Sequence, residues 1–155
     1  MTPPPLLKLG SIKEYKQHYE RHYQREKIFT YDGIRVYFKP QTFGHAFYKN
    51  SKNTAGPKDE FSPERAERMD WVKAALESPD AEIFMGWNKA TKAYDEHRRV
   101  SVVFENFVVV IELGLNRQEI LKGNFVTCYV ANNSIDAIKS SPKWKLEKCL
   151  ERLRK

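Results

Sequence analysis

One histidine stands among aromatic and basic residues in a segment rich in loop signals. His45 follows Gly44 and precedes Phe47, Tyr48 and Lys49. An imidazole titrates near neutral pH and transfers protons, and nearby lysines hold phosphate groups. The segment therefore makes His45 a candidate general acid or base, against the alternative of an ordinary surface or capping histidine.

The other three histidines stand in less specific patterns. His18 and His22 are four residues apart on an expected helix, the spacing of a two-histidine zinc edge, but no glutamate directly follows His18 and no third ligand is evident. We expect this pair to face solvent. His97 lies beside Arg98 and Arg99 at the start of an expected strand, and is an alternative substrate contact.

Several common catalytic signatures are missing from the sequence. It contains no glycine-rich phosphate loop, no serine-centred nucleophile elbow and no cysteine-pair metal cluster. Acidic residues gather only in residues 59–86, where Glu64, Glu67 and Asp70 suit a solvated helix face better than a metal site. We therefore expect no metal and no cofactor.

The elements that must position these residues begin with helical patterns. Residues 11–27 carry Tyr15, Tyr19 and Tyr23 at helical spacing, with Ser11 as the candidate N-cap, and a second helix is expected from Pro63, with Ser62 as its N-cap. A basic amphipathic helix is expected in residues 142–155.

Between the helices the hydrophobic period changes from 3.6 to 2. We expect strands in residues 82–87, 98–104, 107–113 and 124–131, and a further short one in residues 35–39. This order predicts an α+β fold with N-terminal helices packed on one face of a four-stranded antiparallel sheet. We expect residues 1–10 to be flexible and residues 11–155 to form a single domain.

The register of two strands predicts which residues share a face. With Glu105 and Asn106 as the turn, the apolar pairs are Phe104–Phe107, Val102–Val109 and Val100–Ile111, and Arg99 lies opposite Glu112. Continued alternation places Val126, Cys128 and Val130 in the core and Phe125, Thr127 and Tyr129 on the opposite, mixed face with Arg99 and Ser101. A polar sheet face is often merely solvated, but the apolar members of this face favour a cleft beside the basic loop.

Charge indicates the kind of partner. The 155 residues carry a formal net charge of +7, and residues 35–58 hold five basic residues and no acid. This favours RNA, DNA or a membrane surface as partner. The longest apolar run, residues 107–111, is too short to span a membrane, and the two cysteines suggest a reducing compartment, hence a cytoplasmic location.

Histidine, arginine, lysine, threonine and tyrosine side chains around a sheet can cleave RNA without a metal. A histidine takes the proton of the ribose 2′-hydroxyl, a cation stabilises the phosphorane, and hydroxyl groups hold phosphate oxygens. The expected product is a 2′,3′-cyclic phosphate, and DNA would not be cut in this way.

The chain also resembles a known group of nucleases. The segments RVYFKPQTFGHAFYKN, FSPERAERMDWVKAALESPD, GWNKATKAYDEHRRVSVVFENFVVVIEL, NFVTCYVAN and SPKW, in this order, resemble the phage-associated nuclease domains grouped with barnase, EndoU, colicin-type tRNA nucleases and RelE. The resemblance runs from about residue 35 to 144. It implies helices followed by a four-stranded antiparallel sheet and a metal-independent, toxin-like ribonuclease of phage or prophage origin.

The resemblance carries over to residues by position. The histidine of the H-A-F-Y segment is His45, the basic pair at the strand start is Arg98 and Arg99, and the hydroxyl of the F-V-T segment is Thr127. Together with the mixed face, this predicts His45, Arg99, Thr127 and Tyr129 as the catalytic set. The predicted RNA-binding residues are Lys49, Lys52, Arg65, Arg68, Arg98 and Lys122.

Three alternatives remain open. A non-catalytic nucleic-acid-binding module would keep the basic surfaces and give His45 no special role. An ADP-ribosyltransferase would need a catalytic glutamate ahead of the last strand, and none is convincing. A protein-interaction domain of a phage particle would bind without salt dependence. The expected partners are RNA, including tRNA, and an immunity or antitoxin protein, with no membrane.

Overall fold

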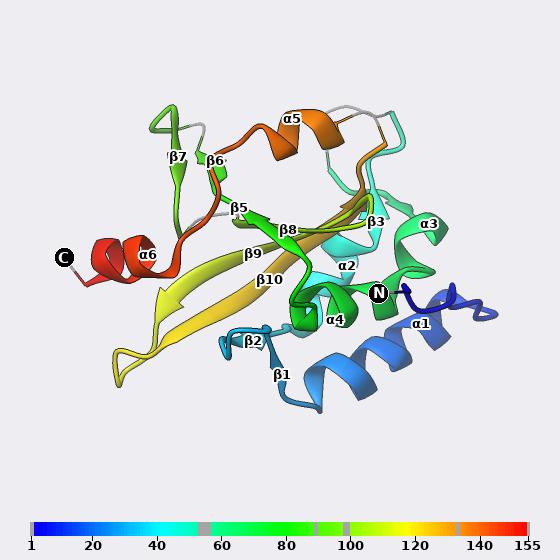
Figure 1. Cartoon of the computed structure of the whole chain (residues 1–155). Helices are drawn as coiled ribbons and strands as arrows, with labels where there is room; N and C mark the ends of the chain where they lie inside the picture. Colours follow the sequence, from blue (N-terminus) through cyan, green and yellow to red (C-terminus); the bar gives the residue numbers. More distant parts are fainter. Residues whose placement is uncertain (1, 53–56, 89, 98–99, 133, 155) are drawn as a thin grey trace.

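A computed structural model describes residues 2–52, 57–88, 90–97, 100–132 and 134–154, and these form a mixed α+β structure (Figure 1). The helices are α1 (Ile12–Tyr19), which continues as the π-helix η1 (Glu20–Gln24), the 3-10 helix η2 (Pro40–Thr42), α2 (Phe43–Ala46), α3 (Pro63–Ala66), α4 (Met69–Glu77), α5 (Ile135–Lys139) and α6 (Leu146–Leu153). The strands are β1 (Ile28–Phe29), β2 (Arg35–Tyr37), β3 (Tyr48–Lys49), β4 (Glu60–Phe61), β5 (Glu82–Phe84), β6 (Gly86–Asn88), β7 (Ala93–Asp95), β8 (Val100–Phe104), β9 (Phe107–Leu115) and β10 (Leu121–Val130).

The local helix signals act as the sequence predicts. The Ser11 hydroxyl accepts a hydrogen bond from the Glu14 N–H at 3.2 Å, which caps α1. Tyr15, Tyr19 and Tyr23 are buried along one side of α1 and η1. Residues 2–9, which sequence predicts to be flexible, contain no helix or strand. They contact α4 and the chain before it, with the Trp71 Nε1–H donating to the Pro4 carbonyl at 2.8 Å.

The main sheet is larger than predicted. In the described residues it has six strands in the order β1-β2-β10-β9-β8-β5. The pairs β10–β9, β9–β8 and β8–β5 are antiparallel, but β2 runs parallel to β10, so the sheet is mixed. A turn with Gly33 at φ 87° reverses the chain after β1 and brings β2 beside β10. The prediction of a four-stranded antiparallel sheet is therefore wrong in both strand number and direction.

The predicted register of β8 and β9 is confirmed. Val102 pairs with Val109, and Phe104 with Phe107, around a turn at Glu105 and Asn106. The pair of Arg99 with Glu112 lies outside the described residues. These pairs hold because the two-residue turn at Glu105 and Asn106 fixes which residues of β8 and β9 lie opposite each other.

The sheet is covered on both faces. Helices α1, α2, α4 and α6 pack on one face, and α5 lies on the other, above the sheet in Figure 1. The main core on the first face includes Tyr19, Val36, Phe47, Val72, Val102, Val109, Ile111, Phe125 and Cys128. A second core on the opposite face includes Phe84, Val103, Val108, Val110 and Ala131, with Ile135 and Ile138 of α5 packed against it. The expectation that helices cover only one face is therefore wrong, because the apolar mixed face required its own cover.

Candidate functional site

The last strand presents its polar side chains on the sheet face opposite the main core, which we call the outer face. On β10 this face carries Lys122, Asn124, Thr127 and Tyr129. Lys122 and Asn124 alternate with Gly123, where an added Cβ would lie 3.4 Å from Leu113 in the main core. Thr127 and Tyr129 alternate with Cys128, which is fully buried in the main core. One face of a single strand therefore presents four polar groups in a row.

A β-bulge in β10 changes two of the predicted positions. Phe125 pairs with Ile111, whereas Thr127 pairs with the next residue back, Val110, so Val126 is the extra residue. Phe125 consequently lies in the main core, and Val126 packs against the second core. The predictions for Phe125 and Val126 are wrong because strict alternation fails at a bulge, whereas those for Thr127 and Tyr129 are correct.

The Thr127 hydroxyl has an unusual environment. Its Oγ1 is buried and has no hydrogen-bond partner among the described residues. A buried hydroxyl normally finds a partner, since desolvation without one costs about 1–3 kcal/mol. Thr127 therefore offers an unused donor and acceptor at the bulge.

Arg65 links the start of α3 to this part of β10. Its Nη1 donates to the carbonyl oxygens of Tyr48 at 2.9 Å and Ala46 at 3.4 Å. Burial raises the pKa of Tyr129, and the positive charge of Arg65 opposes that shift. The phenol therefore stays protonated at neutral pH and can donate a hydrogen bond.

The thiol beside these groups is inert. Burial raises the pKa of Cys128 to about 12, against the opposing charges of Arg65 and Lys58. The Cys128 Sγ–H donates to the Ala46 carbonyl at 3.8 Å. Cys128 therefore fixes α2 against β10 and is no nucleophile at neutral pH.

His45 belongs to α2, which packs on the main-core side of the sheet. It is exposed in the last turn of α2, and its neighbour Ala46 accepts hydrogen bonds from both Cys128 and Arg65. The hydroxyls of Thr127 and Tyr129 lie on the opposite face. β2 pairs with β10 only as far as Asn124, so it does not cover the edge of β10 beside Thr127 and Tyr129. The structure therefore places α2, which carries His45, and the two hydroxyls on different sides of the sheet.

Two predicted lysines flank this place on the β3–β4 hairpin. Lys49 is exposed opposite Glu60, and Lys52 is exposed in the turn that follows β3. Lys58, which sequence analysis counts only within the basic segment, has a pKa lowered by burial and by the charge of Arg65. In the sequence it is marked only by the absence of acids in residues 35–58.

The remaining predicted cations do not join this group. Arg68 donates to the Glu64 carbonyl at 2.9 Å and lies over the Trp71 ring, 5.3 Å from its centroid. Lys122 lies further along β10, with its Nζ 5.8 Å from the centroid of Tyr37. Arg98 and Arg99 lie outside the described residues.

The other histidines hold elements together. The His18 Nε2 lies 2.7 Å from Asp70 of α4, and its ring stacks on His22 with centroids 4.3 Å apart, so the expectation of a solvent-facing pair is wrong for His18. The His97 Nδ1 lies 2.8 Å from the buried Asp95. Sequence reasoning did not single out Asp95, although its spacing of two from His97 is that of side chains on one face of a strand.

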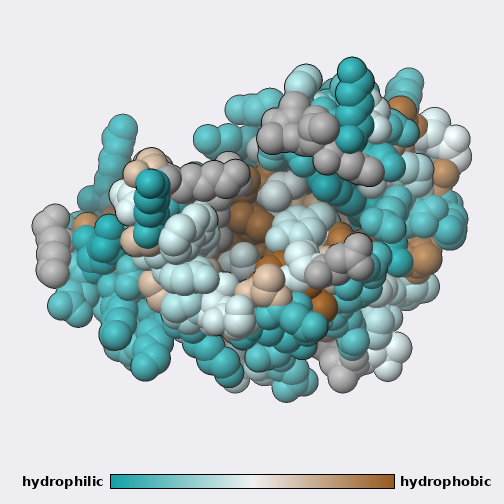
Figure 2. All heavy atoms as spheres, turned by 90° about the horizontal axis from the view of Figure 1, so that it is seen from above, coloured by the Kyte–Doolittle hydropathy of each residue, from teal (hydrophilic) through white to brown (hydrophobic). Residues whose placement is uncertain are grey.

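A hollow marks the outer face. Seen from the side of α5, the surface is depressed near its middle, with hydrophobic side chains at the floor and hydrophilic ones around it (Figure 2). The partly buried members of the second core on this side are Val126, Tyr129, Ile135 and Ile138. The polar row of β10 thus borders incompletely covered apolar surface, as ligand-binding faces do.

Comparisons with family models, curated proteins and solved structures give no match for this chain. Within the described residues, no group of three or more histidine, cysteine or acidic side chains is arranged to hold a metal ion. None of the described helices has both the length and the apolar character needed to cross a bilayer.

Proposed function

We infer that this chain is a metal-independent endoribonuclease, toxin-like and of phage or prophage origin, acting at the end of β10 near α2. The observation that carries the proposal is the buried, unpartnered Thr127 hydroxyl, which shares its face with Tyr129 beside the cation Arg65. The resemblance to phage-associated nuclease domains points to the same segments.

The reaction needs only groups found in this chain. One base removes the proton of a ribose 2′-hydroxyl, the 2′-oxygen forms a bond to phosphorus, and the bond from phosphorus to the 5′-oxygen breaks. An acid protonates the departing 5′-oxygen, which leaves a 2′,3′-cyclic phosphate and a 5′-hydroxyl. His45 is the proposed general base or acid.

The other residues stabilise charge and hold the phosphate. Arg65 and Arg99 are the proposed cations for the phosphorane, and neither hydrogen bond that Arg65 makes to a carbonyl uses its Nη2. Thr127 and Tyr129 donate to phosphate oxygens. Lys49, Lys52 and Lys58 attract the RNA backbone.

The test is cleavage of a mixed tRNA and ribosomal RNA pool in EDTA, with end-group analysis for cyclic phosphate. His45→Ala should slow cleavage by a factor of about 10² to 10⁴. The matched control is His22→Ala, since His22 is also a partly exposed helical histidine, and it should cut at the wild-type rate. An equal loss of cleavage rate in both variants, or no loss in either, would contradict the assignment of His45.

A non-catalytic nucleic-acid-binding module is the second candidate. It is favoured by the exposed aromatic rings beside Arg35, since stacking and phosphate contact need no chemistry. Intact RNA after incubation with the wild-type protein, together with salt-dependent binding that His45→Ala leaves unchanged, would favour this candidate over the nuclease.

A further inference from the structure

The uncovered half of the outer face lies at the other end of β10, where β1 and β2 extend the sheet. Ile28 and Val36 are buried in the main core, so Phe29, Arg35 and Tyr37 lie on the outer face. Phe29 is 43% exposed and Tyr37 is 41% exposed. Two aromatic rings are thus left in water on a sheet whose other half is covered by α5.

The cation between these rings is held by stacking. The Cζ of Arg35 lies 4.6 Å from the ring centroid of Tyr37 and 5.8 Å from that of Phe29. Its Nε is buried without a hydrogen-bond partner, and no described carboxylate forms an ion pair with Arg35. The guanidinium is therefore oriented by the rings while its donors remain available to a ligand.

Further polar groups complete the surface. Lys122 and Asn124 of β10 stand beside Arg35 and Tyr37 in the parallel register. With the exposed Lys39 they line a cavity of about 370 Å³, and none of its described lining residues is acidic. Glu112, opposite Asn124 on β9, is the nearest described acid of this face in the register. We call Phe29, Arg35, Tyr37, Lys39, Lys122 and Asn124 the stacking surface.

We propose that the stacking surface binds single-stranded RNA and holds the part of the substrate that leads away from the cleavage site. This inference rests on the proposed function. Exposed rings bind unpaired bases by their faces, and Arg35, Lys39 and Lys122 meet the phosphates. A paired base hides its face within the stack, so the surface discriminates against duplexes.

The stacking surface and the candidate cleavage site share one strand. Lys122 and Tyr129 are seven residues apart on the same face of β10, which corresponds to about 20 Å along the strand. An RNA of several nucleotides can reach both places, whereas a dinucleotide reaches only one. The surface should therefore matter for long substrates and not for short ones.

Binding is measured by fluorescence anisotropy with a labelled single-stranded 12-mer of 2′-O-methyl RNA. This probe lacks the attacking hydroxyl and stays intact even if the protein is a nuclease. Tyr37→Ala should weaken binding about tenfold, and Tyr37→Phe should bind like the wild type because it keeps the ring. The control is Tyr94→Ala on β7, where the ring is 40% exposed, and it should change affinity less than twofold.

Equal weakening by Tyr37→Ala and Tyr94→Ala, or equal affinity for the 12-mer and its duplex, would overturn the proposal. Absence of RNA binding would also overturn it and would favour a protein partner on this face. Thermal unfolding of Tyr37→Ala checks that the variant folds.

RNA binding at the stacking surface and RNA cleavage can be refuted separately. Intact natural RNA, with probe binding that still depends on Tyr37, would retain the surface and refute the nuclease. Cleavage of a 12-mer with an unchanged KM in Tyr37→Ala would retain the nuclease and refute the surface. A raised KM for the 12-mer, with unchanged kcat/KM for a dinucleotide, is the result we expect.

Discussion

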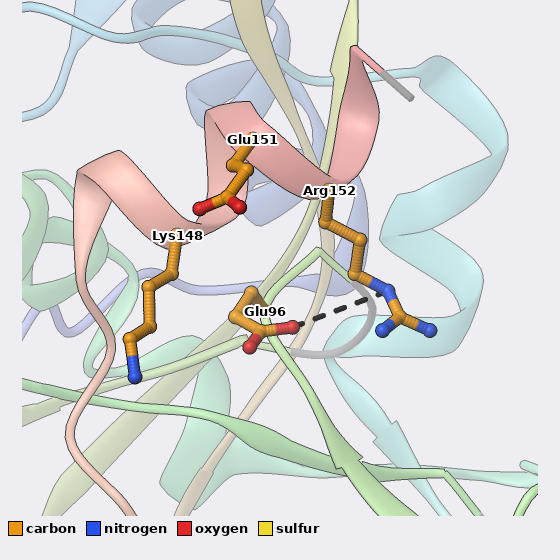
Figure 3. Close-up of a pocket in the computed structure, with 4 residues that line it drawn as sticks. All are labelled: Glu96, Lys148, Glu151 and Arg152. Carbon is orange, nitrogen blue, oxygen red and sulfur yellow. Dashed lines mark ion pairs between the residues drawn. The ribbon is translucent and has the colours of Figure 1, made fainter.

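Two cavities in this molecule are lined by basic residues, yet the charges have different partners. In the β2–β10 cavity, Arg35 and Lys122 lie against the ring of Tyr37. In the β7–α6 cavity, of about 460 Å³, Arg152 and Lys148 share the lining with Glu96 and Glu151 (Figure 3). The first cavity attracts anions, whereas the second largely compensates its own charge.

The contacts around the β7–α6 cavity attach α6, and the chain before it, to the end of β7. The Arg152 Nε lies 3.5 Å from Asp95 and 4.0 Å from Glu96, and the Trp144 Nε1–H donates to the Glu96 carbonyl at 2.8 Å. Because Asp95 is buried, its charge requires partners. A basic helix in the sequence is therefore no evidence for nucleic-acid binding when its cations are used in this way.

The largest expected effect is a loss of protein stability caused by a substitution in the β7–α6 cavity. Arg152→Glu should lower the free energy of unfolding by about 3 kcal/mol, because it replaces the cation beside the buried Asp95 with a like charge. Urea unfolding measures this loss, and affinity for the 12-mer should not change. Lys148→Glu is the control, since no described carboxylate pairs with Lys148, and should cost less than about 0.5 kcal/mol.

The same change of charge in the β2–β10 cavity should act on RNA binding instead of stability. Arg35→Glu should weaken affinity for the single-stranded probe about thirtyfold, since it removes one phosphate contact and repels the backbone. The free energy of unfolding should fall by less than about 1 kcal/mol, because Arg35 has no described ion pair to lose. A large loss of stability with unchanged affinity would erase the distinction between the two cavities.

Alkaline pH should weaken the packing beside the β7–α6 cavity. Burial raises the pKa of Cys149 from 9.0 to about 11, and the charges of Glu96 and Asp95 add to this shift. The folded state therefore binds more protons than the unfolded state between these values, so stability falls as pH rises from 9 to 11. Burial raises the pKa of Cys128, Tyr19 and Tyr23 as well, and these groups contribute to the same fall.

Cys149→Ala separates the contribution of this thiol. Between pH 8 and pH 11 this variant should lose less stability than the wild type. Urea unfolding at each pH measures the loss. A pH dependence identical to the wild type would show that folding does not shift the pKa of Cys149.

The smallest expected effect is on salt dependence. Lys122→Gln should reduce the slope of log affinity against log salt concentration by about 0.7, the value for one phosphate contact with a single strand. Lys148→Gln should leave the slope unchanged. Titrations of the 12-mer between 50 and 200 mM KCl, about the range over which such contacts weaken, resolve this difference.

The sequence predicts the parts of this fold that depend on local pattern. Ser11 caps its helix, and Val102 meets Val109, because capping chemistry and the two-residue turn at Glu105 and Asn106 leave few alternatives. The bulge at Val126 escapes prediction because both sheet faces are apolar at that point, so hydrophobicity does not locate the extra residue.

The candidate site is predictable only in part for the same reason. Thr127 and Tyr129 share the predicted face, since the bulge precedes both. The stacking surface escapes prediction because the three residues of β2 give no signal for a parallel partner far along the chain. Likewise, nothing local indicates that Arg152 belongs beside Asp95.

The parallel pairing of β2 with β10 also has a kinetic consequence. Arg35 meets Lys122 across about 85 residues of intervening chain, a contact of high sequence separation that is costly to close during folding. During synthesis, β2 emerges long before the strand that completes its surface. The stacking surface therefore assembles late, and it is incomplete until β10 has taken its place in the sheet.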